Sequence, residues 1–174
     1  VPFMLAKIAI NGFGRIGRNA LKISLEKKDV EVVAVNDLSS ARILAHLLKY
    51  DSAYGVFAHD IKVEEDGKVV ETEGLTTADD HLVATTPSES FLLIDGKRIK
   101  VIAQKDPQNL PWKDLNIDIV LECTGRLTKD DTAAVHIKAG AKRVIVSAPT
   151  SAKGGSASGG KGGSTKTYLL GVNS

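Results

Sequence analysis

Residues 7–17 read Lys-Ile-Ala-Ile-Asn-Gly-Phe-Gly-Arg-Ile-Gly, a short apolar segment that runs directly into the glycine pattern Gly-x-Gly-x-x-Gly. The apolar segment predicts a buried strand. From Arg15 onward the apolar residues recur at the helical period, which predicts a helix to Lys27. Residues 30–35 form the next apolar strand. The opening of the chain therefore predicts strand, glycine turn, helix and strand in succession.

In this context the three glycines predict a phosphate-binding turn. Gly12 permits the tight turn, Gly14 lets a pyrophosphate approach the backbone, and Gly17 lets the helix pack against the strand. The free N–H groups and the positive dipole end of the helix face the phosphates. The alternative is a glycine turn that serves only close packing, and the strand and helix around the glycines favour the phosphate-binding interpretation.

Asp37 ends the second predicted strand, 20 residues after Gly17. A carboxylate at this place accepts hydrogen bonds from the adenosine ribose hydroxyls and repels a 2′-phosphate. Leu38 offers neither a hydroxyl nor a positive charge to such a phosphate. We therefore expect NAD rather than NADP as the cofactor. The alternative is that Asp37 is a solvated residue at a strand end.

The rest of the chain continues the alternation of strand and helix. The predicted elements are a helix from Ser39 or Ser40 through Tyr50, a strand over 117–121, a helix from Thr128 through Ala139 with Gly140 after its end, and a strand over 144–146. Unbroken apolar strands that alternate with helices are typical of a parallel sheet covered on both faces. The fold class is therefore α/β, a Rossmann-type doubly wound, mostly parallel sheet.

Two Asp-Gly pairs predict antiparallel hairpins at one edge of this sheet. Asp66-Gly67 separates segments 61–64 and 68–71, and Asp95-Gly96 separates segments 91–94 and 97–103; aspartate-glycine between such segments is a strong hairpin signal. The polar residues 72–90 between the hairpins are expected to form a surface loop.

Length and composition limit the domain organisation. The 174 residues predict one domain, over 1–150, followed by a flexible segment over 151–166 and a terminal strand over 167–174. The net charge of +2 argues against nucleic acid or an anionic membrane as the partner. A single cysteine forms no internal disulfide, and no spacing of cysteine or histidine suits a metal site. We expect a cytoplasmic protein without a membrane span.

Several motifs together resemble the glyceraldehyde-3-phosphate dehydrogenase family over nearly the whole chain. They are Ile10-Asn11-Gly12-Phe13-Gly14-Arg15-Ile16-Gly17-Arg18, Val35-Asn36-Asp37, Tyr50-Asp51-Ser52-Ala53-Tyr54-Gly55, Lys105-Asp106-Pro107, Pro111-Trp112, Glu122-Cys123-Thr124-Gly125, Gly140-Ala141-Lys142-Arg143-Val144, Ser147-Ala148-Pro149 and Gly171-Val172-Asn173. The resemblance implies an NAD-binding domain, with the homo-oligomeric assembly, a tetramer, and the glycolytic role of that family.

The resemblance also implies a set of cofactor-binding residues: Gly12, Gly14, Arg15, Ile16, Gly17, Asn36, Asp37, Lys105, Thr124, Gly125 and Ser147. The backbone at Arg15 and Ile16 would bind the pyrophosphate, Asp37 the adenosine ribose and Lys105 the adenine edge. Thr124, Gly125 and Ser147 would line the nicotinamide half. The last three also follow predicted parallel strands, at whose carboxyl ends ligands bind in such sheets.

The sequence departs from the family pattern in four ways. Lys105 stands where the family usually has arginine, residues 67–90 look like an insertion, and residues 151–165 are longer and richer in glycine than usual. The family's nucleophilic cysteine segment is expected just past Ser174, and its catalytic histidine and substrate-phosphate groups later still. The resemblance therefore implies that no catalytic residue lies in this chain and that glyceraldehyde 3-phosphate is reached only through the absent domain.

In the complete enzyme of this family a cysteine thiolate attacks the aldehyde, a histidine moves the proton, hydride passes to NAD, and phosphate cleaves the resulting thioester.

Cys123 is the one thiol here, and we expect it to be a buried packing residue. The four histidines, His46, His59, His81 and His136, are expected on the surface or in packing roles. Two alternatives stay open: a stand-alone dinucleotide-binding module, or half of a related phosphorylated-aldehyde dehydrogenase.

Overall fold

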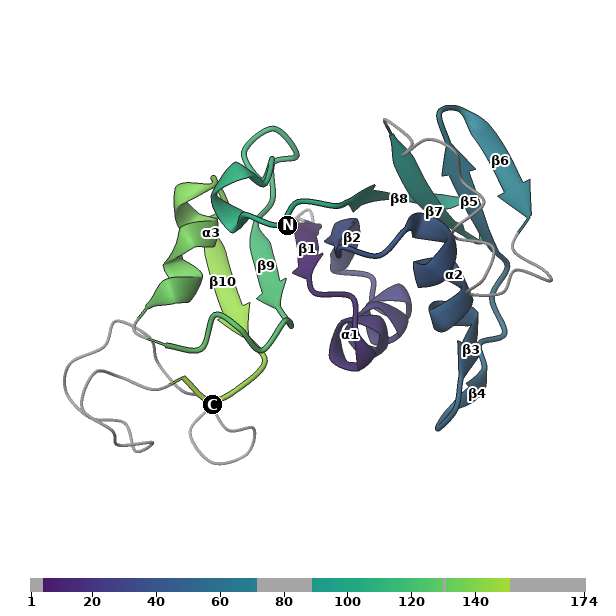
Figure 1. The fold of residues 1–174 in the computed structure, drawn as a ribbon, viewed down its shortest axis with the longest axis horizontal. Helices are drawn as coiled ribbons and strands as arrows, with labels where there is room; N and C mark the ends of the chain where they lie inside the picture. Colours follow the sequence, from purple (N-terminus) through teal and green to yellow (C-terminus); the bar gives the residue numbers. More distant parts are fainter. Residues whose placement is uncertain (1–4, 72–88, 130, 151–174) are drawn as a thin grey trace.

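The computed structural model describes residues 5–71, 89–129 and 131–150 (Figure 1). Its elements follow one another as β1 (Ala6–Asn11), α1 (Arg15–Leu25), β2 (Val30–Asn36), α2 (Ala41–Lys49), β3 (Tyr50–Asp51), β4 (Gly55–Val56), β5 (Ile61–Glu65), β6 (Lys68–Glu71), β7 (Ser90–Ile94), β8 (Lys97–Ile102), η2 (Pro107–Asn109), β9 (Ile119–Glu122), η3 (Thr132–Ala134), α3 (Val135–Lys138) and β10 (Arg143–Val146). The η elements are short 3₁₀ helices.

Eight of the strands form one sheet in the order β10-β9-β1-β2-β8-β7-β5-β6. The first five strands in this order are parallel to one another, and β7, β5 and β6 continue the sheet in antiparallel fashion. Strands β3 and β4 pair separately as a small antiparallel ribbon. The predicted fold class, a mostly parallel α/β sheet with an antiparallel hairpin edge, is confirmed.

Both Asp-Gly hairpins are present. Asp66 and Asp95 each have φ of 48°, and the glycines that follow them each have φ of 79°. Glu65 pairs with Lys68, and Ile94 pairs with Lys97, so each loop has two residues. Two-residue loops with positive φ at both positions match the right-handed twist of the strands, and Asp-Gly is a preferred pair for them. Local sequence alone therefore determines these two turns.

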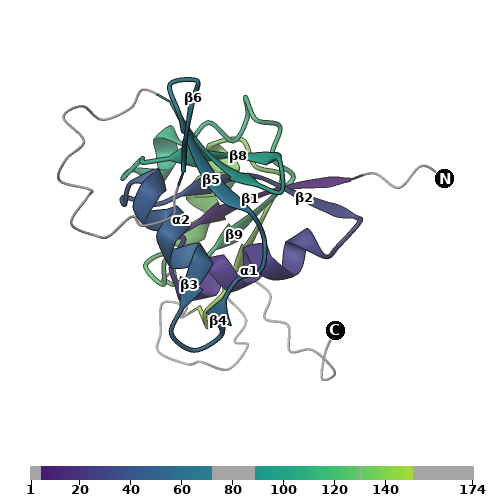
Figure 2. The same ribbon diagram turned by 90° about the vertical axis from the view of Figure 1, so that its right-hand side faces the viewer.

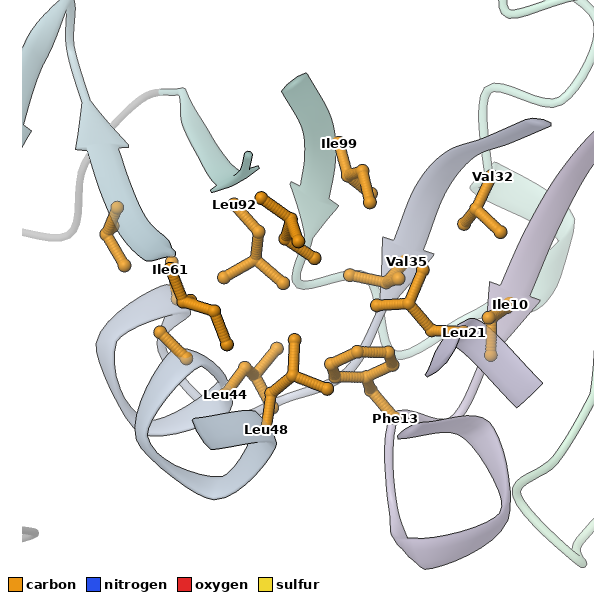
Figure 3. Close-up of a cluster of buried hydrophobic side chains, with 14 of the residues drawn as sticks. Ile10, Phe13, Leu21, Val32, Val35, Leu44, Leu48, Ile61, Leu92 and Ile99 are labelled. Atoms are coloured by element: carbon orange, nitrogen blue, oxygen red, sulfur yellow. The ribbon is translucent and has the colours of Figure 1, made fainter. Parts of the chain in front are cut away.

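Apolar side chains pack on both faces of the sheet. On one face, Ile8 and Ile10 of β1 point into a core that α1 and α2 cover. Ala9, between them, belongs to a second core on the opposite face. In Figure 2, α1 and α2 lie on the same face of the sheet, where both contribute to this first core. Figure 3 shows how side chains from the helices, the glycine turn and the strands meet in the first core; among them are Phe13, Leu21, Val35, Leu44, Leu48, Leu92 and Ile99.

The second core lies on the face covered by η2 and α3. It contains Trp112 and Ile117, which lie between η2 and β9, together with Val120 of β9 and Ala141 before β10. All four are almost completely buried. With helices packed on both faces, the sheet is doubly wound, as the sequence predicts.

Helices α1 and α2 each end earlier than the sequence predicts. Helix α1 ends at Leu25 rather than Lys27, and α2 ends at Lys49 because Tyr50 already begins β3. The Ser40 side chain caps α2 by accepting a hydrogen bond from the Ile43 N–H, as expected of a residue at this position.

The helix predicted from Thr128 through Ala139 is wrong in its first half. Regular structure begins only with η3, because Asp131 adopts the left-handed conformation with φ of 57°, which no helix continues. The α-helical turn α3 is four residues long. Gly140 does follow the helix with φ of 106°, so its predicted role at the C-terminus is confirmed.

Several sequence predictions lie outside the described residues. They concern most of the surface loop over 72–90, the flexible segment over 151–166 and the terminal strand over 167–174. Within the described residues, no helix has the length and apolar character that crossing a lipid bilayer would require.

Candidate functional site at the carboxyl ends of the parallel strands

The glycine turn joins β1 to α1 and is fixed by close backbone contacts. Gly12 has φ of 90°, and its N–H donates to the Asn36 carbonyl at 2.8 Å. A Cβ on Gly12 would lie 2.7 Å from the Thr124 backbone nitrogen, and one on Gly17 would lie 2.2 Å from the Gly12 carbonyl oxygen. Both glycines are therefore required by packing within the protein itself.

Gly14 differs from its two neighbours in the motif. It has ordinary extended backbone, with φ of −74° and ψ of −159°, and a Cβ placed on it would meet no atom within 4 Å. Neither backbone strain nor internal packing explains a glycine here. A molecule that approaches the backbone from outside does explain it, which is the role that the motif assigns to its second glycine.

Gly14 is also the residue before the first turn of α1, and no side chain caps that turn. The Arg18 N–H makes the first intrahelical hydrogen bond, to the Gly14 carbonyl at 3.0 Å. The N–H groups of Arg15 and Ile16 precede that bond, and both side chains are exposed. Unpaired N–H groups at the positive end of a helix favour an anion, so the predicted pyrophosphate contacts lie where the geometry allows them.

Asp37 lies beside the same turn, directly after β2. One carboxylate oxygen, Oδ2, accepts the Phe13 N–H at 2.9 Å, and the other, Oδ1, accepts the Ser39 N–H at 3.0 Å. An ionised carboxylate has about four acceptor positions, so one on each oxygen is left. Those two positions suit the two hydroxyls of a ribose, and the carboxylate is oriented before any ligand binds. Asp37 is therefore more than the solvated strand-end residue of the alternative interpretation.

A row of polar side chains crosses the sheet at this edge. Asn36 of β2, Asn11 of β1 and Glu122 of β9 are register partners at the ends of three adjacent parallel strands. The Asn36 side-chain amide donates to Asn11 Oδ1 at 2.7 Å, and the Asn11 amide donates to Glu122 Oε2 at 2.6 Å. All three residues are buried. The row therefore ties the strand that precedes Asp37 to the strand that precedes the Thr124 turn.

Glu122 is the centre of this row and accepts hydrogen bonds at both oxygens. Oε1 accepts the Thr124 N–H at 2.8 Å and the Thr124 hydroxyl. Oε2 accepts the Asn11 amide and also contacts His136 Nε2 at 2.9 Å. Burial raises the pKa of Glu122, but hydrogen bonds from His136, Thr124 and Asn11 outweigh it, so the pKa is lowered from its ordinary value. The carboxylate is thus held in its charged form by donors.

The hydrogen-bonding state of His136 follows from its second nitrogen. The Trp112 indole N–H donates to His136 Nδ1 at 3.0 Å. Because an indole nitrogen is a donor only, Nδ1 has to be the acceptor, which assigns the ring proton to Nε2, the atom that faces Glu122. His136 is completely buried. Of the two roles that the sequence left open, surface or packing, it takes an interior position within a polar network.

The remaining predicted site residues lie at the same edge of the sheet. Gly125, with φ of 69°, forms the exposed turn after β9 together with Thr124. Ser147 follows β10, and its N–H donates to the Glu122 carbonyl at 3.0 Å. Lys105 is exposed and follows Gln104, which exchanges two hydrogen bonds with the Asn36 side chain. The structure thus brings the predicted residues together, although their contact with a cofactor stays a prediction.

Cys123 lacks the surroundings of an activated nucleophile. It is half-buried, and this burial raises the pKa of its thiol; hydrogen bonding to Ser147 offsets only part of that rise, and the charge of Glu122 adds a smaller increase. A raised pKa leaves less of the reactive thiolate at neutral pH. This agrees with the expectation that Cys123 has a packing role.

Sequence reasoning missed the network of Asn11, Glu122, His136 and Trp112 as a unit. One signal was available: three apolar strands each end in a buried polar residue, Asn11, Asn36 or Glu122. Polar residues that terminate parallel strands meet at one edge of the sheet, so their meeting could have been expected. The participation of His136 and Trp112 depends on how α3 packs and leaves no such signal.

The family model for the glyceraldehyde 3-phosphate dehydrogenase NAD binding domain matches residues 6–87 and 75–130 of this chain. The chain belongs to this family. NAD is accordingly the cofactor of the domain. The two matched parts overlap over residues 75–87, which lie within residues 67–90, the stretch predicted as an insertion.

Curated glyceraldehyde-3-phosphate dehydrogenases are similar to the chain over most of its length. The protein of Clostridium acetobutylicum is 46% identical over 169 residues, which are 97% of this chain and 40% of that protein. The protein of Geobacillus stearothermophilus is 45% identical over 146 residues, 84% of this chain and 36% of that protein. The protein of Thermotoga maritima is 47% identical over 147 residues. The chain therefore spans about 40% of the length of the first of these relatives.

Proposed function

We propose that the chain binds NAD across the carboxyl ends of β1, β2, β9 and β10, with the pyrophosphate at the glycine turn. The observation that carries this proposal is Gly14, a glycine that neither strain nor internal packing requires. It lies beside the first N–H groups of α1, which have no partner within the helix, and beside a carboxylate that Phe13 and Ser39 orient in advance. These groups fit a pyrophosphate flanked by a ribose.

The roles of the individual residues follow from this placement. The backbone N–H groups of Arg15 and Ile16 bind the pyrophosphate, and Asp37 accepts the two hydroxyls of the adenosine ribose. Lys105 lies on the adenine side, and Thr124, Gly125 and Ser147 line the nicotinamide half. Asp37 excludes a 2′-phosphate, since it would bring a second negative charge next to the carboxylate while the neighbouring Leu38 side chain supplies no positive charge.

For the whole protein we propose the oxidation of glyceraldehyde 3-phosphate, because its relatives are named glyceraldehyde-3-phosphate dehydrogenase, and we propose the phosphorylating form of this reaction. When bound, NAD supplies the acceptor for a hydride. The residues of this chain bind and orient it, and we propose that the 174 residues on their own bind the cofactor without turnover. A cytoplasmic location and assembly into a homo-oligomer belong to the same proposal.

The test is calorimetric titration of the 174-residue chain with NAD and with NADP, repeated on Asp37→Ala. The substitution removes both ribose acceptors and leaves the Phe13 and Ser39 N–H groups without a partner. We expect NAD binding to weaken by about 1–3 kcal/mol, the cost of unpaired polar groups. Asp29→Ala is the matched control, because Asp29 is an exposed aspartate before β2, at the opposite end of that strand.

Wild-type chain that binds NAD more tightly than NADP, with this preference lost in Asp37→Ala and kept in Asp29→Ala, supports the proposal. Equal affinity of Asp37→Ala and wild type for NAD contradicts the assigned role of the carboxylate. Absence of NAD binding by the wild-type chain contradicts the proposal as a whole.

A further inference from the structure

The buried carboxylate of Glu122 does not face the solvent side of the cofactor site, yet it contacts the turn that forms part of it. Its Oε1 accepts both polar hydrogens of Thr124, the backbone N–H and the hydroxyl. The Thr124 hydroxyl oxygen in turn accepts the Arg126 N–H at 3.1 Å. The N–H and hydroxyl of Thr124 thus point into the protein, and Glu122 determines where the exposed Thr124–Gly125 turn lies.

The second oxygen of Glu122 connects the same carboxylate to the other half of the site. Oε2 accepts the Asn11 amide, and Asn11 accepts the Asn36 amide, immediately before Asp37. Oε2 also accepts a hydrogen bond from His136 Nε2, and the bond from the Trp112 indole to Nδ1 determines this tautomer of His136. One buried side chain is therefore bonded toward both the ribose-binding strand end and the Thr124 turn.

We propose that Glu122 is a positioning residue of the NAD site, which holds the Thr124–Gly125 turn in place for the nicotinamide half of the cofactor. This inference rests on the proposed assignment of that turn to the nicotinamide half. It assigns to Glu122 no contact with the cofactor, and it predicts that loss of the carboxylate affects one half of the cofactor and not the other.

The substitution Glu122→Gln makes this separation measurable, because all four groups around the carboxylate are donors. A glutamine amide has one acceptor oxygen, so its NH₂ has to face one of the two pairs. Asn11 is fixed by its bond from Asn36, and His136 by its bond from Trp112. The Thr124 hydroxyl can rotate to accept from an NH₂. The oxygen therefore stays with Asn11 and His136, and the Thr124 N–H loses its acceptor.

The experiment measures the dissociation constants of NAD and of ADP for the 174-residue chain and for Glu122→Gln. ADP contains the adenosine and pyrophosphate but lacks the nicotinamide half. We expect the NAD constant of Glu122→Gln to rise roughly tenfold, as for a lost hydrogen bond to a charged group, and the ADP constant to stay within about twofold. The NMR signal of the Thr124 amide should shift, which reports the turn directly.

Val63→Ala is the control, because it should destabilise the fold without moving the Thr124–Gly125 turn. Val63 is completely buried in β5, in the antiparallel part of the sheet, and its substitution leaves the Glu122 contacts intact. We expect its ratio of NAD to ADP affinity to equal that of wild type. If Glu122→Gln does not fold, Thr124→Val takes its place, and the same ratio should fall. This substitution removes the hydroxyl bond to Glu122 and the acceptor of the Arg126 N–H, and keeps the bond from the Thr124 N–H to Glu122.

The outcomes separate the two proposals. Wild type that binds neither NAD nor ADP overturns the proposed function and this inference with it. Wild type that prefers NAD over ADP, together with an unchanged ratio in the folded Glu122 variant or in Thr124→Val, overturns this inference alone. Equal losses of NAD and ADP affinity in Glu122→Gln also overturn it, since they indicate a general structural role.

Discussion

Alanine substitutions at Gly14 and Gly17 should separate stability from cofactor binding within one motif. The two residues lie three positions apart and receive the same added methyl group. At Gly17 the new Cβ would lie 2.2 Å from the Gly12 carbonyl oxygen, whereas at Gly14 it would meet nothing within 4 Å. The structure therefore predicts opposite phenotypes for one chemical change.

For Gly17→Ala, helix propensity favours alanine by about 1 kcal/mol. Overpacking in a well-packed site costs about 1–3 kcal/mol, and the 2.2 Å approach to the Gly12 backbone, together with the Ile10 side chain at 3.0 Å, places this substitution at about the upper limit. The expected net loss is about 2 kcal/mol, or about 4–8 °C in melting temperature for a domain of this size. Thermal unfolding followed by circular dichroism measures it.

For Gly14→Ala, the extended backbone is open to alanine, so stability should stay within about 0.5 kcal/mol of wild type. The methyl group occupies the place where the pyrophosphate approaches, and a similar overpacking cost of about 1–3 kcal/mol weakens NAD binding by about 5- to 150-fold. Calorimetric titration measures the affinity. A Gly14→Ala chain with unchanged NAD affinity, or a Gly17→Ala chain as stable as wild type, would refute the reasoning.

Three more outcomes follow from burial and from pKa directions. The pKa of Glu122 is lowered in the folded state, so its ionised carboxylate stabilises the fold fully above the ordinary pKa of 4.5. This contribution to the free energy of unfolding is lost as the pH falls through the lowered pKa. The urea midpoints of wild type and Glu122→Gln should therefore converge on acidification. Leu48→Ala should destabilise the fold by about 2–5 kcal/mol, and Leu38→Ala, at an exposed leucine, by less than about 0.5 kcal/mol in the same denaturation assay. The Cys123 thiol, its pKa raised by burial, should react with iodoacetamide more slowly than a cysteine peptide at pH 7.5, and an equal rate would contradict the assignment.

The features that could be predicted from the sequence are those that depend on neighbouring residues. The two Asp-Gly hairpins and the glycine turn each need positive φ at given positions, and those positions carry the residues that adopt it. The helix from Thr128 could not be predicted correctly, because the left-handed conformation of Asp131 interrupts a pattern that is helical by composition. Its preference for that conformation is too weak to detect against the surrounding apolar period.

The polar network could be predicted only in part because it joins residues that are distant in sequence. Asn11 and Glu122 are separated by 111 residues, and Asn11 and His136 by 125. Their meeting requires the exact register of β1 with β9 and the packing of a four-residue helical turn against Trp112. The meeting of Asn11 and Glu122 could be predicted, since parallel strands bring their carboxyl ends together. The packing of the helical turn against Trp112 could not, because no local sequence pattern indicates it.

The energetics of Glu122 give a reason to connect this network with function rather than with stability. A carboxylate buried next to a neutral imidazole has no cation to offset its desolvation, and only the four donors compensate it. Apolar residues of similar volume often serve stability equally well in such places. What an apolar residue does not supply is an acceptor for the Thr124 N–H and for Asn11 together. The benefit of Glu122 therefore lies in the fixed separation of two turns that, in the proposed site, one extended ligand contacts at the same time.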